Sequence, residues 1–137
     1  MNTFLLKIVT PDGMLFEGQA QKLIVRTISG DVAILARHIN FVAPLGMGQA
    51  IVEDAEGNRR TAACMGGMLS VINGQADLVP TTFEWAEKID PDRADKSLQR
   101  AQKILENKDS SDADLRLAEA RLKRALVRKS VASAGKF

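Results

Sequence analysis

A short charged segment opens the second part of the sequence. Residues 89–94 read Ile-Asp-Pro-Asp-Arg-Ala, and an Asp-Pro pair is a strong signal for the start of a helix. Asp accepts hydrogen bonds from the free N–H groups of the first turn, and Pro suits the first helical position. The segment therefore places a carboxylate, Asp90, and a guanidinium, Arg93, on one helical turn. Further basic residues follow at Arg100, Arg121, Arg124 and Arg128. This arrangement predicts an anion site built on helices.

The same basic residues also fit a simpler interpretation. Arg124 and Arg128 are four positions apart, so they share one face of a helix, which solvent can cover. Glu119 and Lys123 have the same spacing and form a favourable pair on such a face. The residue pattern alone leaves both an anion site and a solvated charged face open.

Catalytic and metal-binding patterns are missing from the rest of the sequence. The chain has one Cys, Cys64, and one His, His38, which excludes internal disulfides and argues against a Cys-rich zinc site, a His cluster or a Ser-His-Asp triad. The pair Gly66-Gly67 lacks the Lys-Ser/Thr of a phosphate loop and predicts a bulge or a close approach between sheets. We therefore expect no catalytic residue, no metal site and no required cofactor.

Composition narrows the class of protein further. The 137 residues suit one domain or two small ones, and 45% are hydrophobic, which is enough for a packed core. Aromatic residues reach only 4%, which argues against a protein that stacks nucleic-acid bases. No apolar run approaches the ~18 residues that span a bilayer, and the N-terminus has no signal pattern. We expect a soluble intracellular protein that docks on something larger.

Charge is distributed unevenly along the chain. Residues 1–89 contain seven basic and nine acidic residues, a net charge of −2, whereas residues 90–137 contain twelve and eight, a net charge of +4. The second part is therefore the one expected to meet an anion or an acidic surface.

The first part of the sequence predicts short strands joined by turns. Pro11-Asp12-Gly13 and Ser29-Gly30-Asp31 are turn signals, and Asn73-Gly74 is typical of a tight hairpin. Short apolar or alternating segments between such turns predict strands near the following residues: 4–8, 14–16, 22–27, 32–35, 50–52, 60–64, 68–72 and 76–79. No ten-residue helical pattern separates them. We therefore expect an antiparallel β-sandwich over residues 1–87.

The second part predicts two helices of about sixteen residues each. Residues 108–111 interrupt the helical pattern, and Ser111 with Asp114 resembles a variant capping box for the second helix. The short loop implies an antiparallel hairpin over residues 88–137, which makes the whole chain an α+β protein. A thin apolar stripe runs along each helix, formed by Ala94, Leu98, Ala101 and Leu105 on the first, and by Leu115, Ala118, Leu122 and Ala125 on the second. Such a hairpin buries little area and can be shifted between arrangements.

The order of these elements, and several short strings, resemble the epsilon subunits of bacterial F-type ATP synthases. The resemblance covers nearly the whole chain. Each string is weak alone, but their order and spacing are specific. Two departures stand out: the family often has Pro-Gly before the His, where this chain has Ala36-Arg37, and Ser before the Gly pair, where it has Met65. The strings are Val9-Thr10-Pro11-Asp12-Gly13, Gly30-Asp31-Val32-Ala33-Ile34-Leu35 followed by His38, Val42-Ala43-Pro44-Leu45, Gly66-Gly67-Met68-Leu69 and Ala118-Glu119-Ala120-Arg121-Leu122-Lys123-Arg124-Ala125.

The resemblance implies a role at the foot of a rotating central stalk. It implies partners in the gamma subunit, the c-ring and, for an extended hairpin that blocks ATP hydrolysis, the alpha and beta subunits of the catalytic head. It also implies a peripheral position at the cytoplasmic face of the bacterial plasma membrane. Two rotor contacts are carried over from the family: Asp31 toward the c-ring and His38 toward the gamma subunit.

The resemblance also implies a regulatory ligand. Several bacterial members bind ATP in the folded hairpin through an Ile/Leu-Asp-x-x-Arg-Ala motif, which residues 89–94 match in full. The ATP-binding residues carried over are Glu84, Ile89, Asp90, Arg93, Ala94, Arg100, Arg124 and Arg128. Two alternatives stay open: a purely mechanical rotor-coupling subunit without nucleotide binding, and a small protein whose basic hairpin binds nucleic acid. Strong salt dependence of DNA binding would identify the second, and we expect no nucleic-acid partner.

Overall fold

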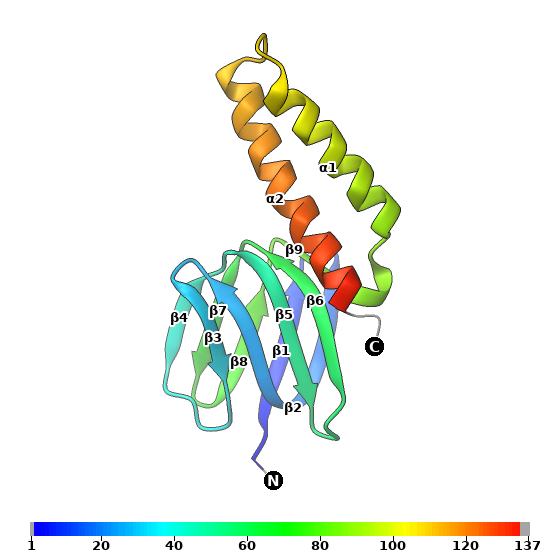
Figure 1. The fold of residues 1–137 in the computed structure, drawn as a ribbon. Helices are drawn as coiled ribbons and strands as arrows, with labels where there is room; N and C mark the ends of the chain where they lie inside the picture. Colours follow the sequence, from blue (N-terminus) through cyan, green and yellow to red (C-terminus); the bar gives the residue numbers. More distant parts are fainter. Residues whose placement is uncertain (1, 135–137) are drawn as a thin grey trace. The chain divides into compact units, whose positions relative to one another are not determined.

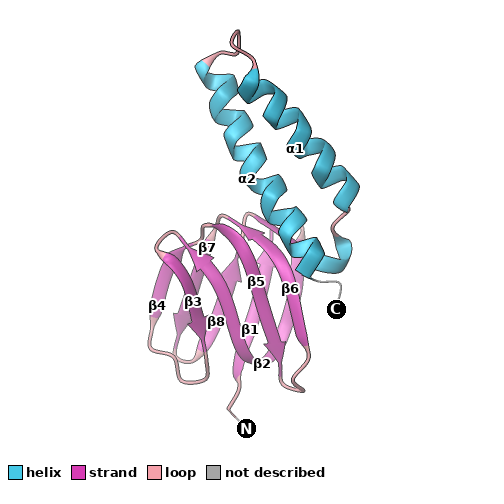
Figure 2. Ribbon diagram, in the orientation of Figure 1, coloured by secondary structure: helices cyan, strands magenta, loops and turns pink. Residues whose placement is uncertain are grey.

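The computed structural model describes residues 2–134. The chain divides into two compact units, Met1–Trp85 and Ala86–Phe137, which are called the β unit and the helical unit below. The division falls two residues before the expected boundary between residues 87 and 88. A sandwich of strands followed by two helices confirms the α+β class (Figures 1 and 2).

Nine strands lie in the described part of the β unit. They are β1 (Phe4–Thr10), β2 (Gly13–Thr27), β3 (Gly30–Ile34), β4 (Phe41–Pro44), β5 (Met47–Asp54), β6 (Arg59–Met65), β7 (Met68–Ile72), β8 (Gln75–Val79) and β9 (Thr82–Trp85). The sheet order is β4-β7-β8-β1-β2-β5-β6-β9, and β3 pairs with β2. In Figure 1 the strands face one another across the interior of the unit.

One pairing departs from the expected antiparallel arrangement. β1 and β8 run parallel, with Leu6 beside Ala76 and Ile8 beside Leu78, whereas every other named pairing in residues 2–134 is antiparallel. The tight β7–β8 hairpin is placed next to β1 in the sheet, so that β8 lies between β7 and β1. The relative direction of β1 and β8 follows from that insertion, which local turn signals cannot reveal.

β2 is a single long strand, although the sequence predicted two short ones at residues 14–16 and 22–27. Its first half pairs with β1, and its second half pairs with β3 and β5. The pairing with β5 shifts register between Ala20 and Lys22. The intervening residues lack a strong strand pattern, and ladder hydrogen bonds to neighbouring strands keep them extended. β4 and β9, of four residues each, were not predicted, and each is held in the sheet by pairing with one neighbouring strand.

The core of the β unit is made by alternate residues of its strands. In β1 every second residue is buried, beginning with Phe4, as a strand with one covered face requires. Other core members are Leu23, Val25, Val52, Leu69, Val71, Leu78, Phe83 and Trp85. Cys64 is also buried there, and the loss of solvation raises the pKa of its thiol to about 12. The thiol therefore stays protonated at neutral pH and is a packing residue.

The pair Gly66-Gly67 confirms the predicted close approach. It joins β6 to β7 with φ values of 71° and 92°, a region that L-residues with side chains rarely adopt. A Cβ added at Gly67 would lie 2.1 Å from the carbonyl oxygen of Val79 and 2.6 Å from the Cα of Pro80. The backbone of this turn therefore passes against the end of β8 in a space that only glycine allows.

Arg37 occupies the position before His38 where the resembling family often has glycine. Its φ is +65°, in the left-handed region that costs a residue with a side chain about 1–2 kcal/mol. The departure from Pro-Gly therefore leaves a strained backbone in the middle of the loop between β3 and β4.

Replacing Arg37 by glycine is expected to raise the free energy of unfolding by about 0.5–1 kcal/mol. Relief of the left-handed strain exceeds the extra entropy that glycine gives the unfolded chain. Urea denaturation followed by Trp85 fluorescence measures the difference. Arg37→Ala is the control, because it removes the side chain and keeps the strain. A gain of the same size with alanine would mean that the side chain, not the backbone, is unfavourable.

The helical unit begins with a 3-10 turn, η1 (Ala86–Lys88), and continues with α1 (Pro91–Glu106) and α2 (Asp112–Ala134). Asp90 is the N-cap of α1, as predicted. Ser111 Oγ accepts a hydrogen bond from the Asp114 N–H at 3.1 Å, which confirms the start of the second helix. α2 has 23 residues, longer than the sixteen expected, because nothing in the sequence after Ala125 breaks the helix.

The two helices pack along each other through small residues. The four alanines of the predicted stripes, Ala94, Ala101, Ala118 and Ala125, are buried. The four leucines of the same stripes are only half-buried. Alanine on both helices allows a close approach of the backbones, and the larger leucines remain at the edge of the contact.

Candidate functional site

The segment of residues 89–94 forms the entry to α1. Asp90 has an extended backbone, and its Oδ1 accepts hydrogen bonds from the N–H groups of Asp92 at 3.0 Å and Arg93 at 3.3 Å. The carboxylate thus caps the helix and fixes the backbone that carries Arg93. Ile89 and Ala94 are buried on either side of this turn, so they hold it in place and leave the polar groups outside.

The four candidate arginines lie on the two helices. Arg93 and Arg100 of α1 are exposed, whereas Arg124 and Arg128 of α2 are half-buried. The remaining candidate, Glu84, lies on β9 in the other unit and is half-buried. Seven of the eight residues are therefore contributed by the helical unit.

One ion pair establishes how the two helices face each other. Lys129 Nζ lies 2.9 Å from Asp95 Oδ1, which joins α2 to α1. Asp95 follows the buried Ala94 by one position, and Lys129 follows the buried Ala125 by four. Each is therefore displaced from its buried alanine in the same rotational sense about its own helix axis. In an antiparallel pair, side chains that are displaced in the same sense on the two helices border the same groove. The short distance between Asp95 and Lys129 agrees with this geometry.

The arginines lie on the opposite groove of the hairpin. Arg93 and Arg100 each precede a buried alanine of α1 by one position, so they share the flank opposite Asp95. Arg124 and Arg128 occupy the flank of α2 opposite Lys129 by the same reasoning. The packing therefore brings four guanidinium-bearing residues, two from each helix, to one side of the hairpin. Spacing in the sequence could not show this, because it does not establish which flanks meet.

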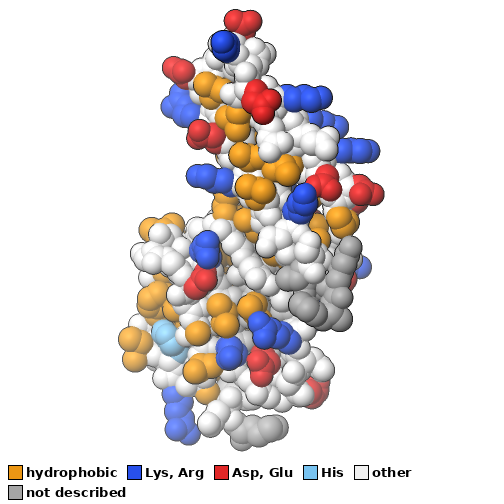
Figure 3. Space-filling model, in the orientation of Figure 1, with side chains coloured by type: hydrophobic (Ala, Val, Ile, Leu, Met, Phe, Trp, Pro, Cys, Tyr) orange, Lys and Arg blue, Asp and Glu red, His pale blue; other side chains and the backbone are white. Residues whose placement is uncertain are grey.

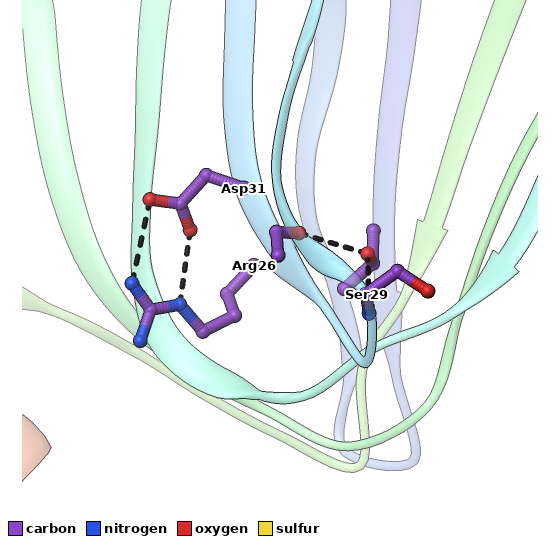
Figure 4. A network of polar contacts seen from close by, with 5 residues as sticks. Arg26, Ser29 and Asp31 are labelled. Carbon is purple, nitrogen blue, oxygen red and sulfur yellow. Dashed lines mark hydrogen bonds and ion pairs between the residues drawn. The ribbon is translucent and has the colours of Figure 1, made fainter.

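The two candidate rotor contacts lie in the β unit. Asp31 is exposed on β3, and its two carboxylate oxygens accept hydrogen bonds from Arg26 Nε at 3.0 Å and Nη2 at 3.4 Å (Figure 4). The hydrogen bonds from Arg26 hold the pKa of Asp31 below its ordinary value, and Asp31 in turn raises the pKa of Arg26. Arg26 was not among the predicted site residues, although its place opposite Asp31 in a hairpin is a signal that the sequence contains.

His38 lies in the loop between β3 and β4 and is half-buried. Its Nδ1 is 2.8 Å from the carbonyl oxygen of Ile39, and its ring meets the edge of Phe41 with centroids 5.8 Å apart. These contacts orient the ring. Asp31 lies near the start of β3, whereas His38 follows the end of that strand by four residues.

Two further properties concern residues 2–134 as a whole. Among them, no group of three His, Cys, Asp or Glu side chains is arranged to hold a metal ion. No helix in this range combines the length and apolar character that crossing a bilayer requires.

Both units match one protein family. Residues 3–86 match the β-sandwich domain of the ATP synthase delta/epsilon chain, and residues 87–133 match its long α-helix domain. The chain belongs to the ATP synthase delta/epsilon chain family. This membership confirms the resemblance inferred from the short strings, and the two matched domains correspond to the β unit and the helical unit.

Bacterial epsilon chains are similar to this member along almost their full length. An ATP synthase epsilon chain of Bacillus velezensis is 42% identical over 132 residues, which cover 96% of this chain and 98% of the relative. One from an Exiguobacterium species is 37% identical and covers 96% of each chain. A third, from Caldicellulosiruptor bescii, is 36% identical and covers 99% of this chain and 98% of the relative.

Solved structures show that the fold of this family member recurs. A chain in the mitochondrial ATP synthase of Euglena gracilis superposes with a TM-score of 0.84 at 22% identity, covering 93% of this chain and 80% of the other. A chain of the Tetrahymena thermophila mitochondrial ATP synthase gives a TM-score of 0.64 at 13% identity, with coverage of 93% and 95%. At these identities the likeness concerns the fold.

Proposed function

We propose that this epsilon-type chain is a non-catalytic central-stalk subunit of an F-type proton-translocating ATP synthase. The β unit would attach to the rotor, at the gamma subunit and the c-ring, on the cytoplasmic face of the bacterial plasma membrane. The helical unit would inhibit ATP hydrolysis by extending toward the alpha and beta subunits. The observation that carries the proposal is the family match over both units, at 42% identity to a bacterial epsilon chain.

The surface of the β unit supports attachment to other proteins. Among the described residues 2–85, nine large apolar side chains are exposed, which is many for a small unit with a full core of its own. Contiguous exposed apolar area is typical of surfaces that dock on partners. Figure 3 shows apolar side chains on the face of the strands that it presents. The exposed residues are Met14, Leu15, Ile28, Leu35, Ile39, Val42, Met68, Ile72 and Val79.

Three of these residues form a row with a proline across neighbouring strands. Pro44 of β4 is paired with Met68 of β7, and Met68 is paired with Val79 of β8. The Ile28 N–H donates to the Pro44 carbonyl at 3.1 Å, which ties the tip of the β2–β3 hairpin to the same row. We call Ile28, Pro44, Met68 and Val79 the tip row, and all four are exposed. It offers a rotor partner a row of apolar side chains, and the exposed Asp31 follows Ile28 by three positions in the chain.

ATP would be the regulatory ligand of the folded hairpin. A triphosphate carries several negative charges, and guanidinium groups make charge-assisted hydrogen bonds to phosphate oxygens. Arg93 and Arg100 share a groove with Arg124 and Arg128 only while the helices are packed together. A ligand that uses both pairs therefore binds the folded hairpin and opposes the extended one. At ~100 times its dissociation constant it stabilises that state by roughly 2.7 kcal/mol.

Millimolar ATP is expected to raise the melting temperature of the isolated protein by several degrees, because it binds the folded hairpin selectively. Arg93→Ala and Arg128→Ala should each reduce this shift, since each removes a phosphate partner from one helix. Thermal melts with and without ATP, followed by circular dichroism at a helical wavelength, measure it.

Arg116→Ala is the matched control for these variants. Arg116 is an exposed arginine of α2 on the face away from the buried alanines, so its loss should leave the ATP shift intact. An absent shift in the unmodified protein, or equal shifts in all three variants and the parent, would favour the mechanical coupler. Binding of DNA that weakens steeply with salt would favour the nucleic-acid alternative.

A further inference from the structure

The side chain of Arg26 is held in place from two sides. On one side it meets Asp31 through two hydrogen bonds, as Figure 4 shows. On the other side its aliphatic stem lies against Gly46 and Gly48. A Cβ added at Gly48 would be 2.8 Å from the Cβ of Arg26, and one at Gly46 would be 3.4 Å from its Cγ. The Arg26 carbonyl also accepts a hydrogen bond from the Gly46 N–H at 3.0 Å. The two glycines thus form a seat for the arginine stem.

The turn beyond this pair is stiffened by its own side chains. Thr27 Oγ1 accepts a hydrogen bond from the Ser29 N–H at 3.1 Å and donates one to the Gly30 carbonyl at 2.8 Å. These bonds close the turn of residues 27–30, which joins β2 to β3. The hairpin therefore presents Asp31 from a backbone that has little freedom, three positions after Ile28 of the tip row.

Stability of the fold does not account for this arrangement. The side chains of Arg26 and Asp31 are 53% and 56% exposed, and ion pairs this open to solvent contribute little to folding. A seated, bidentate arginine does, however, restrict the rotation of a carboxylate. What the arrangement achieves is an exposed carboxylate whose position and direction are fixed by Arg26.

We infer that Arg26, seated on Gly46 and Gly48, is a positioning residue that orients Asp31 for the contact between the β unit and its rotor partner. The inference rests on the proposed function, because it needs the c-ring as that partner. A carboxylate offers about four lone-pair positions, of which Arg26 takes two, so two remain for N–H donors or a cation of the c-ring. The lowered pKa of Asp31 agrees with a carboxylate kept ionised for such donors.

The test uses the assembled ATP synthase depleted of this subunit and reconstituted with variants. Asp31→Asn is expected to raise the half-saturating concentration for reassociation about tenfold, and Arg26→Met, which keeps an unbranched stem on its seat, by about three- to tenfold. Arg26→Lys should recover only part of the loss, because an ammonium cannot hold both oxygens in the same way. In the Asp31→Asn background, Arg26→Met should add nothing, since its effect passes through the carboxylate.

Three controls separate positioning from stability and from failure of the proposed rotor contact. The pKa of Asp31, measured by carboxyl NMR in the free protein, should rise in Arg26→Met. It should stay constant in Lys7→Gln, which removes a different ion pair between strands, Lys7–Glu17. If Asp31→Asn does not alter reassociation, both the proposed rotor contact and the positioning role of Arg26 are wrong. If Asp31→Asn weakens reassociation but Arg26→Met does not, or if the two effects add, the contact stands and the positioning role is wrong.

Discussion

Replacing Gly67 with alanine is expected to destabilise the β unit by about 3–5 kcal/mol, enough to unfold a small domain. The new methyl group would lie 2.1 Å from the Val79 carbonyl oxygen and 2.6 Å from the Pro80 Cα, both backbone atoms that no rotamer change can move. The φ of 92° adds strain for any residue with a side chain. Urea unfolding followed by Trp85 fluorescence measures the loss.

Gly74→Ala is the matched control for that variant. Gly74 also has a positive φ, of 78°, but a Cβ there would meet no heavy atom within 4 Å. Its replacement should cost about 1–2 kcal/mol from backbone strain alone. The additional loss of stability at Gly67, compared with that at Gly74, then measures the energetic cost of the clash with the backbone at the end of β8. Equal losses at the two positions would show that the close approach has no energetic consequence.

Truncation after Lys88 is expected to leave assembly with the ATP synthase intact and to raise its rate of ATP hydrolysis severalfold. The core of the β unit is formed entirely by residues up to Trp85, so this unit keeps its packing without the helices. The removed part contains residues 90–137, whose net charge of +4 suits insertion between larger acidic subunits. Hydrolysis by the reconstituted complex, with subunit content measured in parallel, checks both expectations.

Lys129→Gln tests whether the effect of truncation comes from loss of the helices. It removes the ion pair with Asp95, keeps both helices and should not raise hydrolysis, because the inhibitory segment is still present. The proposed division of labour is wrong if the truncated chain fails to assemble. It is equally wrong if the truncated chain assembles and hydrolysis stays unchanged.

Local signals predicted much of the fold from the sequence. Asn73-Gly74 forms the tight turn it indicated, with positive φ at both residues. Asp90 and Ser111 cap the two helices where the sequence placed them. Each of these features depends on hydrogen bonds between residues at most four positions apart, so the residue types at those positions are sufficient to specify them.

Features that depend on distant strands were not predictable in the same way. The extended backbone in the middle of β2 and the parallel pairing of β1 with β8 arise from ladders between residues far apart in the chain. The four-residue strands β4 and β9 exist for the same reason.

For the candidate site, residue types and spacing were sufficient to identify the charged residues and the helix cap. They placed Asp90 and Arg93 on one turn, and Arg124 and Arg128 on one face. That the arginines of the two helices share a groove follows from the packing, because the buried alanines and the Asp95–Lys129 pair select the flanks that meet. The seat of Arg26 on two glycines was likewise invisible in the sequence. Periodicity describes one element at a time, whereas a site depends on how separate elements are packed.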